Sequence, residues 1–176
     1  MREVYIFDID GCIMSPIFSD FTNDETREKI VGDAVHNGNS IKLFPDFVKY
    51  YSKYCVQEKS IYFITGRKKS EFGRLTDNHL RPLVDIKPFK VIYYPEAKPH
   101  KIRKYFNWKA KGIKTIIKNT NNKKHFNVYM KEDFTFNIFD DMNEYFSKIR
   151  KFGDKQNIQI HLTMIENENS WNQLLQ

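Results

Sequence analysis

Five short apolar segments with helical patterns between them constrain the fold of this 176-residue chain most strongly. The strands expected from them are 3–8, 61–65, 90–94, 136–140 and 158–164. The first four are continuous apolar runs, which is typical of strands covered on both faces of a parallel sheet. Helical periodicity lies at 43–55, 67–81, 109–118 and 142–152. This order predicts a doubly wound, Rossmann-like α/β fold with a parallel sheet of about five strands.

The length fits a single domain, for which we expect bounds of 1–165. Residues 14–40 are polar and irregular, and we expect them to form a flap between the first strand and its helix. We expect residues 166–176 to be a C-terminal tail. The connections between the first three strands are too short for a large inserted domain, so the sequence predicts a minimal cap and an open site.

Composition argues against several classes of protein. Apolar residues make up 40% and charged residues 29%, as in ordinary globular domains. No apolar run approaches the roughly 20 residues of a membrane-spanning helix, and no signal-peptide core precedes Asp8, so we expect a cytoplasmic protein without a membrane partner. Cys12 and Cys55 lack the spacing of a disulfide framework or a metal site, and we expect two free, buried thiols.

The net charge of +7 is concentrated in one segment. Residues 98–124 contain ten Lys or Arg and no Asp or Glu, so the rest of the chain is about neutral to acidic. One interpretation is an anionic partner, with nucleic acid first; the other is a solvated, lysine-rich face.

Polar residues occur where three of the expected strands end. They are Asp8 and Asp10 in the first, Thr65, Gly66 and Arg67 in the second, and Asp140 and Asp141 in the fourth. In open parallel sheets, ligands collect at the carboxyl ends of the strands. Four carboxylates in one crevice repel each other unless a cation neutralises them, and all-oxygen ligation suits Mg²⁺. The sequence therefore predicts a magnesium site formed by the four aspartates.

Alternation along an extended segment places Asp8 and Asp10 on the same side, with Ile9 turned away. Gly11 then permits a sharp turn and a close approach of the backbone. Any one of these acidic pairs, taken alone, more often has a capping or surface role. The three strand ends together favour a catalytic site.

The motifs FDIDGC, FITGR and NIFDDM resemble, in order and spacing, the first, second and fourth motifs of the haloacid dehalogenase-like (HAD) superfamily. The resemblance implies phosphoryl transfer through an aspartyl-phosphate. Asp8 would attack phosphorus, Asp10 would act as general acid and base, and Thr65 with nearby backbone N–H groups would hold the phosphate. Mg²⁺ would be held by Asp8, the Asp10 carbonyl and the acidic pair Asp140 and Asp141. A carboxylate nucleophile, a neighbouring acid and a metal suit this chemistry.

The third HAD motif is a lysine near the start of a helix, and several lysines compete for it. Lys109 shares the apolar face of Ile113 and Ile116, so it is our first choice, with Lys101 and Lys111 in reserve. Lys111, Lys114 and Lys118 are expected to share the opposite, solvent-facing side of the helix.

A narrower resemblance concerns the substrate. ITGR, NWKAKGI and IFDDMNEYF are similar to the HAD domain of Swiss Army Knife RNA repair proteins and, more loosely, to the 3′-phosphatase domains of polynucleotide kinases. This implies RNA or DNA ends as partners. The residues expected to contact such a substrate are Thr65, Gly66, Arg67, Lys111, Lys114 and Lys118. Tyr105, Phe106 or Trp108 would either stack on a base or pack in the interior.

Two other functions remain open at this point. One is a small-molecule phosphatase, such as a nucleotidase, with the flap closing over its substrate. The other is a nucleic-acid-binding module whose HAD-like site is vestigial, although the five intact residues Asp8, Asp10, Thr65, Asp140 and Asp141 argue against loss of activity.

Overall fold

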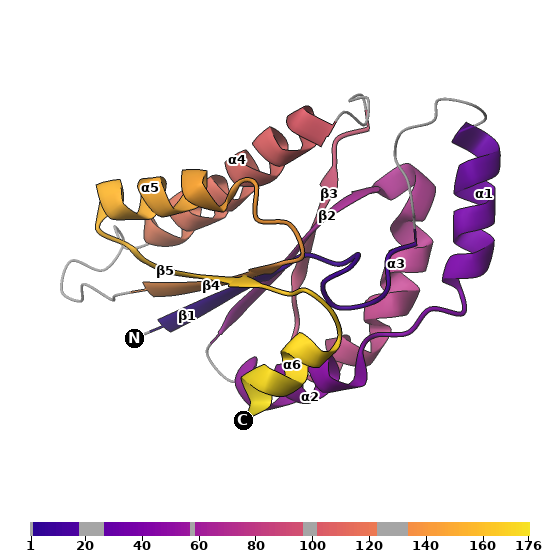
Figure 1. Ribbon diagram of the computed structural model, residues 1–176, viewed down its shortest axis with the longest axis horizontal. Coiled ribbons are helices and arrows are strands. Elements are labelled where there is room, and N and C mark those ends of the chain that lie inside the picture. The colour runs from indigo at the N-terminus through magenta and orange to yellow at the C-terminus, as the bar shows by residue number, and fades with distance from the viewer. Residues whose placement is uncertain (1, 18–26, 57–58, 97–101, 123–133) are drawn as a thin grey trace.

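A five-stranded, all-parallel sheet forms the centre of the molecule (Figure 1). The computed structural model describes residues 2–17, 27–56, 59–96, 102–122 and 134–176. The strands are β1 (Arg2–Phe7), β2 (Ser60–Lys68), β3 (Lys90–Tyr94), β4 (Phe134–Asp140) and β5 (Gln159–Met164). Their spatial order is β3-β2-β1-β4-β5. The predicted α/β fold with a parallel sheet of about five strands is confirmed.

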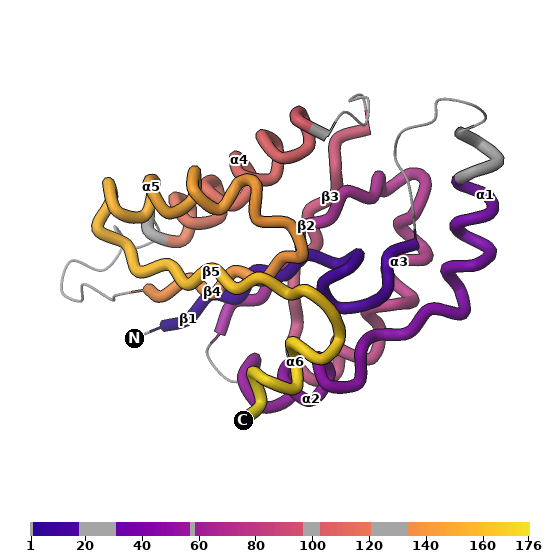
Figure 2. Tube along the Cα trace, in the orientation of Figure 1, coloured from indigo at the N-terminus to yellow at the C-terminus, as the bar shows by residue number. Residues whose placement is uncertain are grey.

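Helices cover both faces of the sheet (Figure 1). They are α1 (Arg27–Gly38), α2 (Pro45–Tyr54), α3 (Lys69–Val84), α4 (Ile102–Asn122), α5 (Phe146–Gln156) and α6 (Asn169–Leu175). The trace in Figure 2 shows α4 and α5 above one face and α2 and α6 below the other. The direction of winding changes between β1 and β4, which lie side by side although most of the chain separates them in sequence.

Alternation along β1 divides the interior into two cores. Val4 and Ile6 face α4 and α5, together with Ile113 of α4. Tyr5 and Phe7 face α2, α3 and α6 in a core that is rich in aromatic side chains. Because the strand buries side chains on both faces, it appears in the sequence as an uninterrupted apolar run.

Local signals set several helix ends. α2 begins at Pro45, whose fixed φ and missing N–H suit the first helical position. α5 ends at Gln156. Its C-cap, Asn157, adopts the left-handed conformation with φ of 53°, and the Ile158 N–H donates to Gly153 O. α4 begins at Ile102, earlier than the expected start at residue 109.

Two segments differ from the sequence expectations. Within the expected flap at 14–40, residues 27–38 form α1, whose Ala34 packs against Phe72 of α3; residues 18–26 lie outside the described part of the chain. The expected tail at 166–176 contains α6, and its Trp171 is completely buried in the aromatic core. Its few apolar residues gave no clear helical periodicity, but Trp171, Leu174 and Leu175 all pack against the core.

Among the helices that the structure describes, none combines the length and apolar character needed to cross a membrane.

Candidate active site

The candidate site lies at the carboxyl end of β1 and β4, where the strand order changes direction. Phe7 and Phe139 are register partners, and the backbone N–H of Asp8 donates to Phe139 O at 2.9 Å. Asp8, immediately after β1, is therefore adjacent to Asp140, the last residue of β4. Asp141 follows in the next position of the chain. The parallel pairing of two distant strands thus brings the first and fourth sequence motifs together.

Three carboxylates form a close cluster. Asp8, Asp140 and Asp141 each offer one oxygen, and these oxygens all lie within 4.8 Å of one another. Asp8 and Asp140 are buried. Burial raises the pKa of Asp8 well above its usual range, although Lys109 opposes the shift. Burial and then repulsion from Asp140 raise the pKa of Asp141 to about 6. Burial and mutual repulsion thus disfavour the ionised form of these carboxyl groups unless a cation compensates for their charge.

Lys109 of α4 reaches into this cluster and is fully buried. Its Nζ lies 2.8 Å from Asp8 Oδ1 and 2.5 Å from Asp140 Oδ2. Burial alone would lower the pKa of Lys109, but Asp140 and Asp8 together outweigh it and hold the pKa well above its usual value. Lys109 is therefore an ammonium group at neutral pH. Of the other lysines considered, Lys111 is exposed and Lys101 lies outside the described residues.

Two tyrosines complete the surroundings of Lys109. Its Nζ lies 5.3 Å from the ring centre of Tyr105 and 5.7 Å from that of Tyr145. The Tyr145 hydroxyl donates to Asp140 Oδ2, and the backbone N–H of Met142 donates to Asp140 Oδ1 at 3.0 Å. Burial, followed by the charge of Asp140, raises the pKa of Tyr145 well above its usual value, so this hydroxyl remains a donor. These contacts fix the orientation of Asp140.

The donor set fits a divalent cation. Among the described residues, the buried polar atoms that lack a well-aligned hydrogen bond are Asp8 Oδ1, Asp141 Oδ1 and Lys109 Nζ. The contact between Lys109 and Asp8 is therefore an ion pair with poor hydrogen-bond geometry. One ammonium group does not balance three clustered carboxylates, and two of these three atoms are hard oxygen donors of the kind that Mg²⁺ prefers.

Gly11 holds Asp141 against the loop that follows β1. Its φ is +81°, a left-handed conformation that favours glycine. A Cβ at this position would lie 2.2 Å from Asp141 Oδ2 and 2.8 Å from Asp141 Cγ. The missing side chain thus makes the space that the Asp141 carboxylate fills.

Asp10 is directed away from the carboxylate cluster. Its two oxygens accept from Arg67 Nη2 at 2.7 Å and Arg67 Nε at 2.8 Å. This bidentate pair is the strong geometry for guanidinium and carboxylate. The Asp10 carboxylate is not part of the three-aspartate cluster, so it supplies no metal ligand in this arrangement.

Arg67 is among the residues expected to contact substrate, but only 2% of it is exposed. Besides Asp10, its guanidinium contacts Thr76 Oγ1 and His79 Nδ1, each at 3.1 Å. His79 Nε2 in turn lies 2.7 Å from Gly38 O, at the end of α1. The structure therefore places Arg67 as a support for Asp10, linked through His79 to the segment between β1 and β2.

Thr65 and Gly66 lie in the last part of β2. Thr65 is fully buried, and its hydroxyl accepts from the Arg67 backbone N–H at 3.2 Å. Gly66 lies against the Tyr105 ring, because a Cβ there would come within 3.1 Å of Tyr105 Cε2. Gly66 is thereby linked to the cluster, because the Tyr105 ring also lies beside Lys109 Nζ. Their roles in holding phosphate remain predictions.

The three lysines expected on one face of α4 are found in two environments. Lys114 Nζ and Lys118 Nζ lie over the ring of Phe152 in α5, at 5.6 and 5.7 Å from its centre. Lys111 lines a groove beside β3.

Cys12 and Cys55 are both free and buried. Burial, followed by the charge of Asp8, raises the pKa of the Cys12 thiol. Cys12 is therefore a poor nucleophile.

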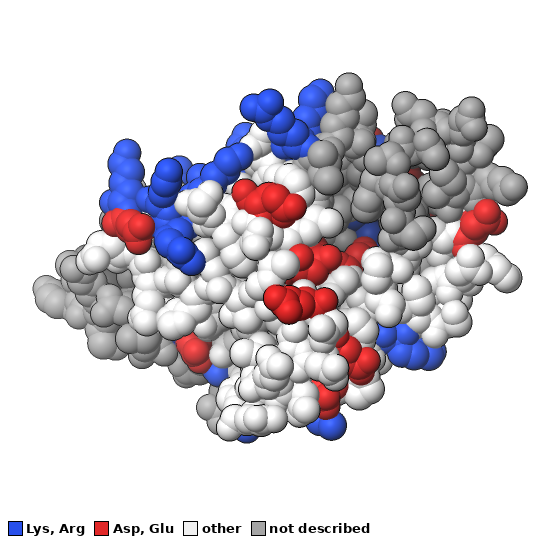
Figure 3. Space-filling view, viewed as in Figure 1, with Lys and Arg blue, Asp and Glu red and all other residues white. Residues whose placement is uncertain are grey.

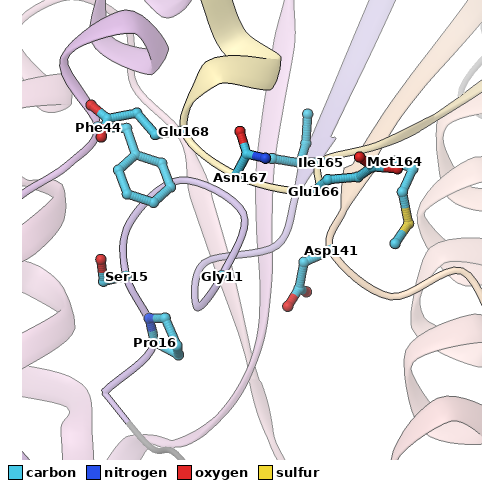
Figure 4. Close-up of a pocket in the computed structure, with 10 residues that line it drawn as sticks. All are labelled: Gly11, Ser15, Pro16, Phe44, Asp141, Met164, Ile165, Glu166, Asn167 and Glu168. Carbon is cyan, nitrogen blue, oxygen red and sulfur yellow. The ribbon is translucent and has the colours of Figure 1, made fainter.

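A pocket of about 600 Å³ opens beside Asp141 (Figure 4). In the close-up, the Gly11 loop lies between Phe44 and the Asp141 side chain. Glu166 and Glu168 also line this pocket, and no Lys or Arg does so among the described residues. The pocket is therefore acidic and contains one aromatic surface.

Sequence reasoning missed two supporting residues and gave Tyr105 another role. Tyr105 precedes Lys109 by four positions and shares its face of α4, which is a signal that could have been used. Tyr145 and His79 carry no comparable signal, since their contacts depend on how the loop after β4 and the helix α3 are placed.

No known protein family and no curated protein matches this sequence. Among solved structures, a chain of the Pnkp1/Rnl/Hen1 RNA repair complex is similar, with 15% sequence identity and a TM-score of 0.46. The similarity covers 92% of the present chain and 42% of that chain. A likeness this distant carries no information about the activity of the protein described here.

Proposed function

We propose that this protein is a Mg²⁺-dependent phosphomonoester hydrolase of the HAD type, that Asp8 is its nucleophile, and that nucleic-acid ends are its substrate. The observation that carries the proposal is the buried ammonium of Lys109, held between Asp8 and Asp140 with Asp141 beside them. A purely structural ion pair does not need three carboxylates around one lysine at an edge of the sheet where ligands collect.

In the first step, a carboxylate oxygen of Asp8 attacks the substrate phosphorus. The bond from phosphorus to the ester oxygen breaks, and the leaving oxygen takes a proton from Asp10. The product is an acyl phosphate on Asp8. Asp10 must exchange a contact with Arg67 for one with the leaving oxygen, so Arg67 sets the position from which Asp10 acts.

In the second step, the oxygen of a water molecule attacks phosphorus while Asp10 takes a proton from that water. The bond between phosphorus and Asp8 breaks, which releases inorganic phosphate, frees the Asp8 carboxylate and leaves Asp10 protonated for the next turnover. Lys109, which is already next to Asp8, stabilises the charge that develops on the phosphoryl oxygens.

Asp8, Asp140 and Asp141 are the residues that would hold Mg²⁺, together with the backbone carbonyl of Asp10. When bound, the ion supplies charge neutralisation between the anionic nucleophile and the anionic phosphate. Tyr145 keeps Asp140 oriented by donating to its Oδ2.

The charge distribution supports a polyanionic substrate that approaches from the side of α4. Lys and Arg side chains gather over α4 and α5 in Figure 3. The pocket on the side of Asp141 is lined instead by Glu166 and Glu168, which would repel further phosphates.

A small-molecule phosphatase is the second candidate. The acidic pocket beside Asp141 measures about 600 Å³ and offers the Phe44 ring, so it has space for a nucleoside-sized leaving group without further charge.

The decisive experiment compares phosphate release from 3′-phosphorylated RNA, 5′-phosphorylated RNA and a mononucleotide, with Mg²⁺ and with EDTA. We expect Mg²⁺-dependent release, fastest from an oligonucleotide end, and its loss in Asp8→Asn with the fold intact. Asp154→Asn, on the exposed surface of α5, is the matched control. Beryllium fluoride should form a complex with the wild type and with Asp154→Asn but not with Asp8→Asn. Near-normal turnover in Asp8→Asn would refute the assignment of Asp8 as the nucleophile. A preference for the mononucleotide would favour the small-molecule phosphatase.

A further inference from the structure

A groove of about 480 Å³ runs between α4 and the edge strand β3, outside the carboxylate cluster. The lining side chains that matter here are Tyr62, Lys90, Trp108, Lys111, Thr115 and Asn119. No Asp or Glu lines the groove among the described residues. It thus combines an aromatic surface, two cations and neutral hydrogen-bonding groups.

The two lysines are available at the groove's surface. Lys90, the first residue of β3, and Lys111, in the middle of α4, are both exposed. They approach the groove from opposite walls, one from the strand and the other from the helix. Such an arrangement is complementary to a chain of negative charges lying between them.

Trp108 gives the groove a rigid aromatic surface. Its indole ring stacks on Tyr105, with ring centres 5.9 Å apart, and meets Tyr94 edge-on at 5.0 Å. It remains partly exposed while lining the groove. A tryptophan fixed by neighbouring rings can stack on a base with little loss of conformational freedom.

The groove begins next to the candidate active site. Trp108 precedes Lys109 directly in α4, and its stacking partner Tyr105 also lies beside the Lys109 ammonium. From Trp108 to Asn119 the helix axis advances about 16 Å, at about 1.5 Å per residue. A strand whose terminal phosphate is at Asp8 can therefore continue past Trp108 toward Lys111 and Lys90.

We propose that this groove binds a single-stranded nucleic acid, with a base on Trp108 and backbone phosphates at Lys111 and Lys90. The inference rests on the proposed function for the direction in which the strand runs, but binding in the groove requires no catalysis. It extends that function by giving the path of the substrate beyond its reacting end. It also excludes continuous duplex at that point, because both faces of a base inside a duplex are covered by neighbouring bases.

The first experiment measures the affinity of a fluorescent, single-stranded RNA dodecamer without terminal phosphate, by anisotropy over a range of salt concentrations. The variant Lys90→Glu/Lys111→Glu is compared with Arg74→Glu/Arg81→Glu, which makes the same change of charge on exposed positions of α3, on the other face of the sheet. We expect the groove variant to bind roughly tenfold more weakly at low salt and its log–log salt slope to fall by about 1.4. An equal or larger effect of the α3 variant would overturn the assignment.

The second experiment uses Trp108 as the reporter. The chain has two tryptophans, and the other, Trp171, is fully buried. Single-stranded RNA should quench the Trp108 emission, and the quenching should disappear in Trp108→Phe, which keeps an aromatic ring against Tyr94 and Tyr105. Absence of quenching in the wild type, or equal quenching by duplex RNA or an acidic peptide, would contradict the proposal.

The two proposals fail in different ways. If the wild-type protein has no phosphatase activity on any substrate but binds RNA in the groove, only the proposed function is refuted. Normal hydrolysis of a small aryl phosphate, with unchanged RNA affinity in the groove variant, would refute only the path of the strand.

Discussion

Lys109 could not remain charged in the interior without its carboxylate neighbours, and those neighbours could not remain together without it. Removing one member of a buried ion pair typically costs about 3–5 kcal/mol, because the remaining charge is left without compensation. The cluster is therefore costly for folding unless a ligand or metal adds to the balance. Its position at the carboxyl ends of β1 and β4, where ligands collect in parallel sheets, is what favours function over structure.

Gly11 provides the sharpest test at the scale of one residue. We expect Gly11→Ala to lower the free energy of unfolding by about 1–3 kcal/mol, because the new Cβ would meet Asp141 Oδ2 at 2.2 Å and the φ of +81° is strained for alanine. Mg²⁺ affinity should fall as well, since Asp141 must move. Denaturant unfolding and calorimetry measure the two effects.

The matched control is Gly32→Ala in α1, where nothing lies within 4 Å of the added Cβ. It should stabilise the protein by about 0.5–1 kcal/mol through helix propensity. Wild-type Mg²⁺ binding by Gly11→Ala would mean that the position of Asp141 is not required for the metal.

The pKa of Asp141 predicts an unusual pH dependence for the metal-free protein. Its folded-state value of about 6 lies above the ordinary value of 3.8, so the folded state binds more protons than the unfolded state between these pH values. Stability should therefore fall as pH rises from about 4 to 6, by roughly 2–3 kcal/mol from this group. Denaturation in EDTA should show that Asp141→Asn gains stability relative to wild type across this range. An unchanged difference between the two proteins from pH 4 to 7 would contradict the assignment.

At the scale of elements, the short helix α6 secures the loop that carries the candidate nucleophile. Trp171 Nε1 donates to the backbone oxygen of Cys12 at 2.7 Å, immediately after Gly11. Its ring also packs edge-on against Phe47, with centres 4.9 Å apart. A seven-residue helix is not stable in isolation, so α6 depends on the contacts of Trp171, and of Leu174 and Leu175 beside it, with the aromatic core.

We expect Trp171→Ala to lower the free energy of unfolding by about 3–5 kcal/mol, because it leaves a cavity and an unpaired carbonyl. Trp171→Phe should have a smaller effect, since it retains most of the packing. Gln173→Ala, on the exposed side of the same helix, is the control and should change stability by less than about 0.5 kcal/mol. Similar stability of Trp171→Ala and the control, measured by denaturant unfolding, would show that α6 is not required for the fold.

At the scale of the whole molecule, the apolar runs were sufficient to predict the sheet. All five strands lie where the sequence indicated, and β2 extends past residue 65 to Lys68. Helical periodicity also placed Lys109 on the apolar side of α4, and the structure buries it there. The contact between Arg67 and Asp10 was not predicted, since each residue also fits a surface role and only the tertiary arrangement joins them. The helices α1 and α6 lack a long apolar stripe and dock through a few contacts.

The pairing of β1 with β4 has a consequence for synthesis of the chain. Asp8 leaves the ribosome far ahead of Asp140 and Asp141, and at about 5–20 residues per second the interval is on the order of ten seconds. Throughout that interval a nascent chain can pair β1 with β2, but β4, the second neighbour of β1, has not yet been made. Asp140 and Asp141 are also missing. Mg²⁺ should therefore give no protection from proteolysis to nascent chains arrested before residue 134, and protection should appear only once β4 has emerged. Cellular magnesium would then act on the finished domain and not on its early folding.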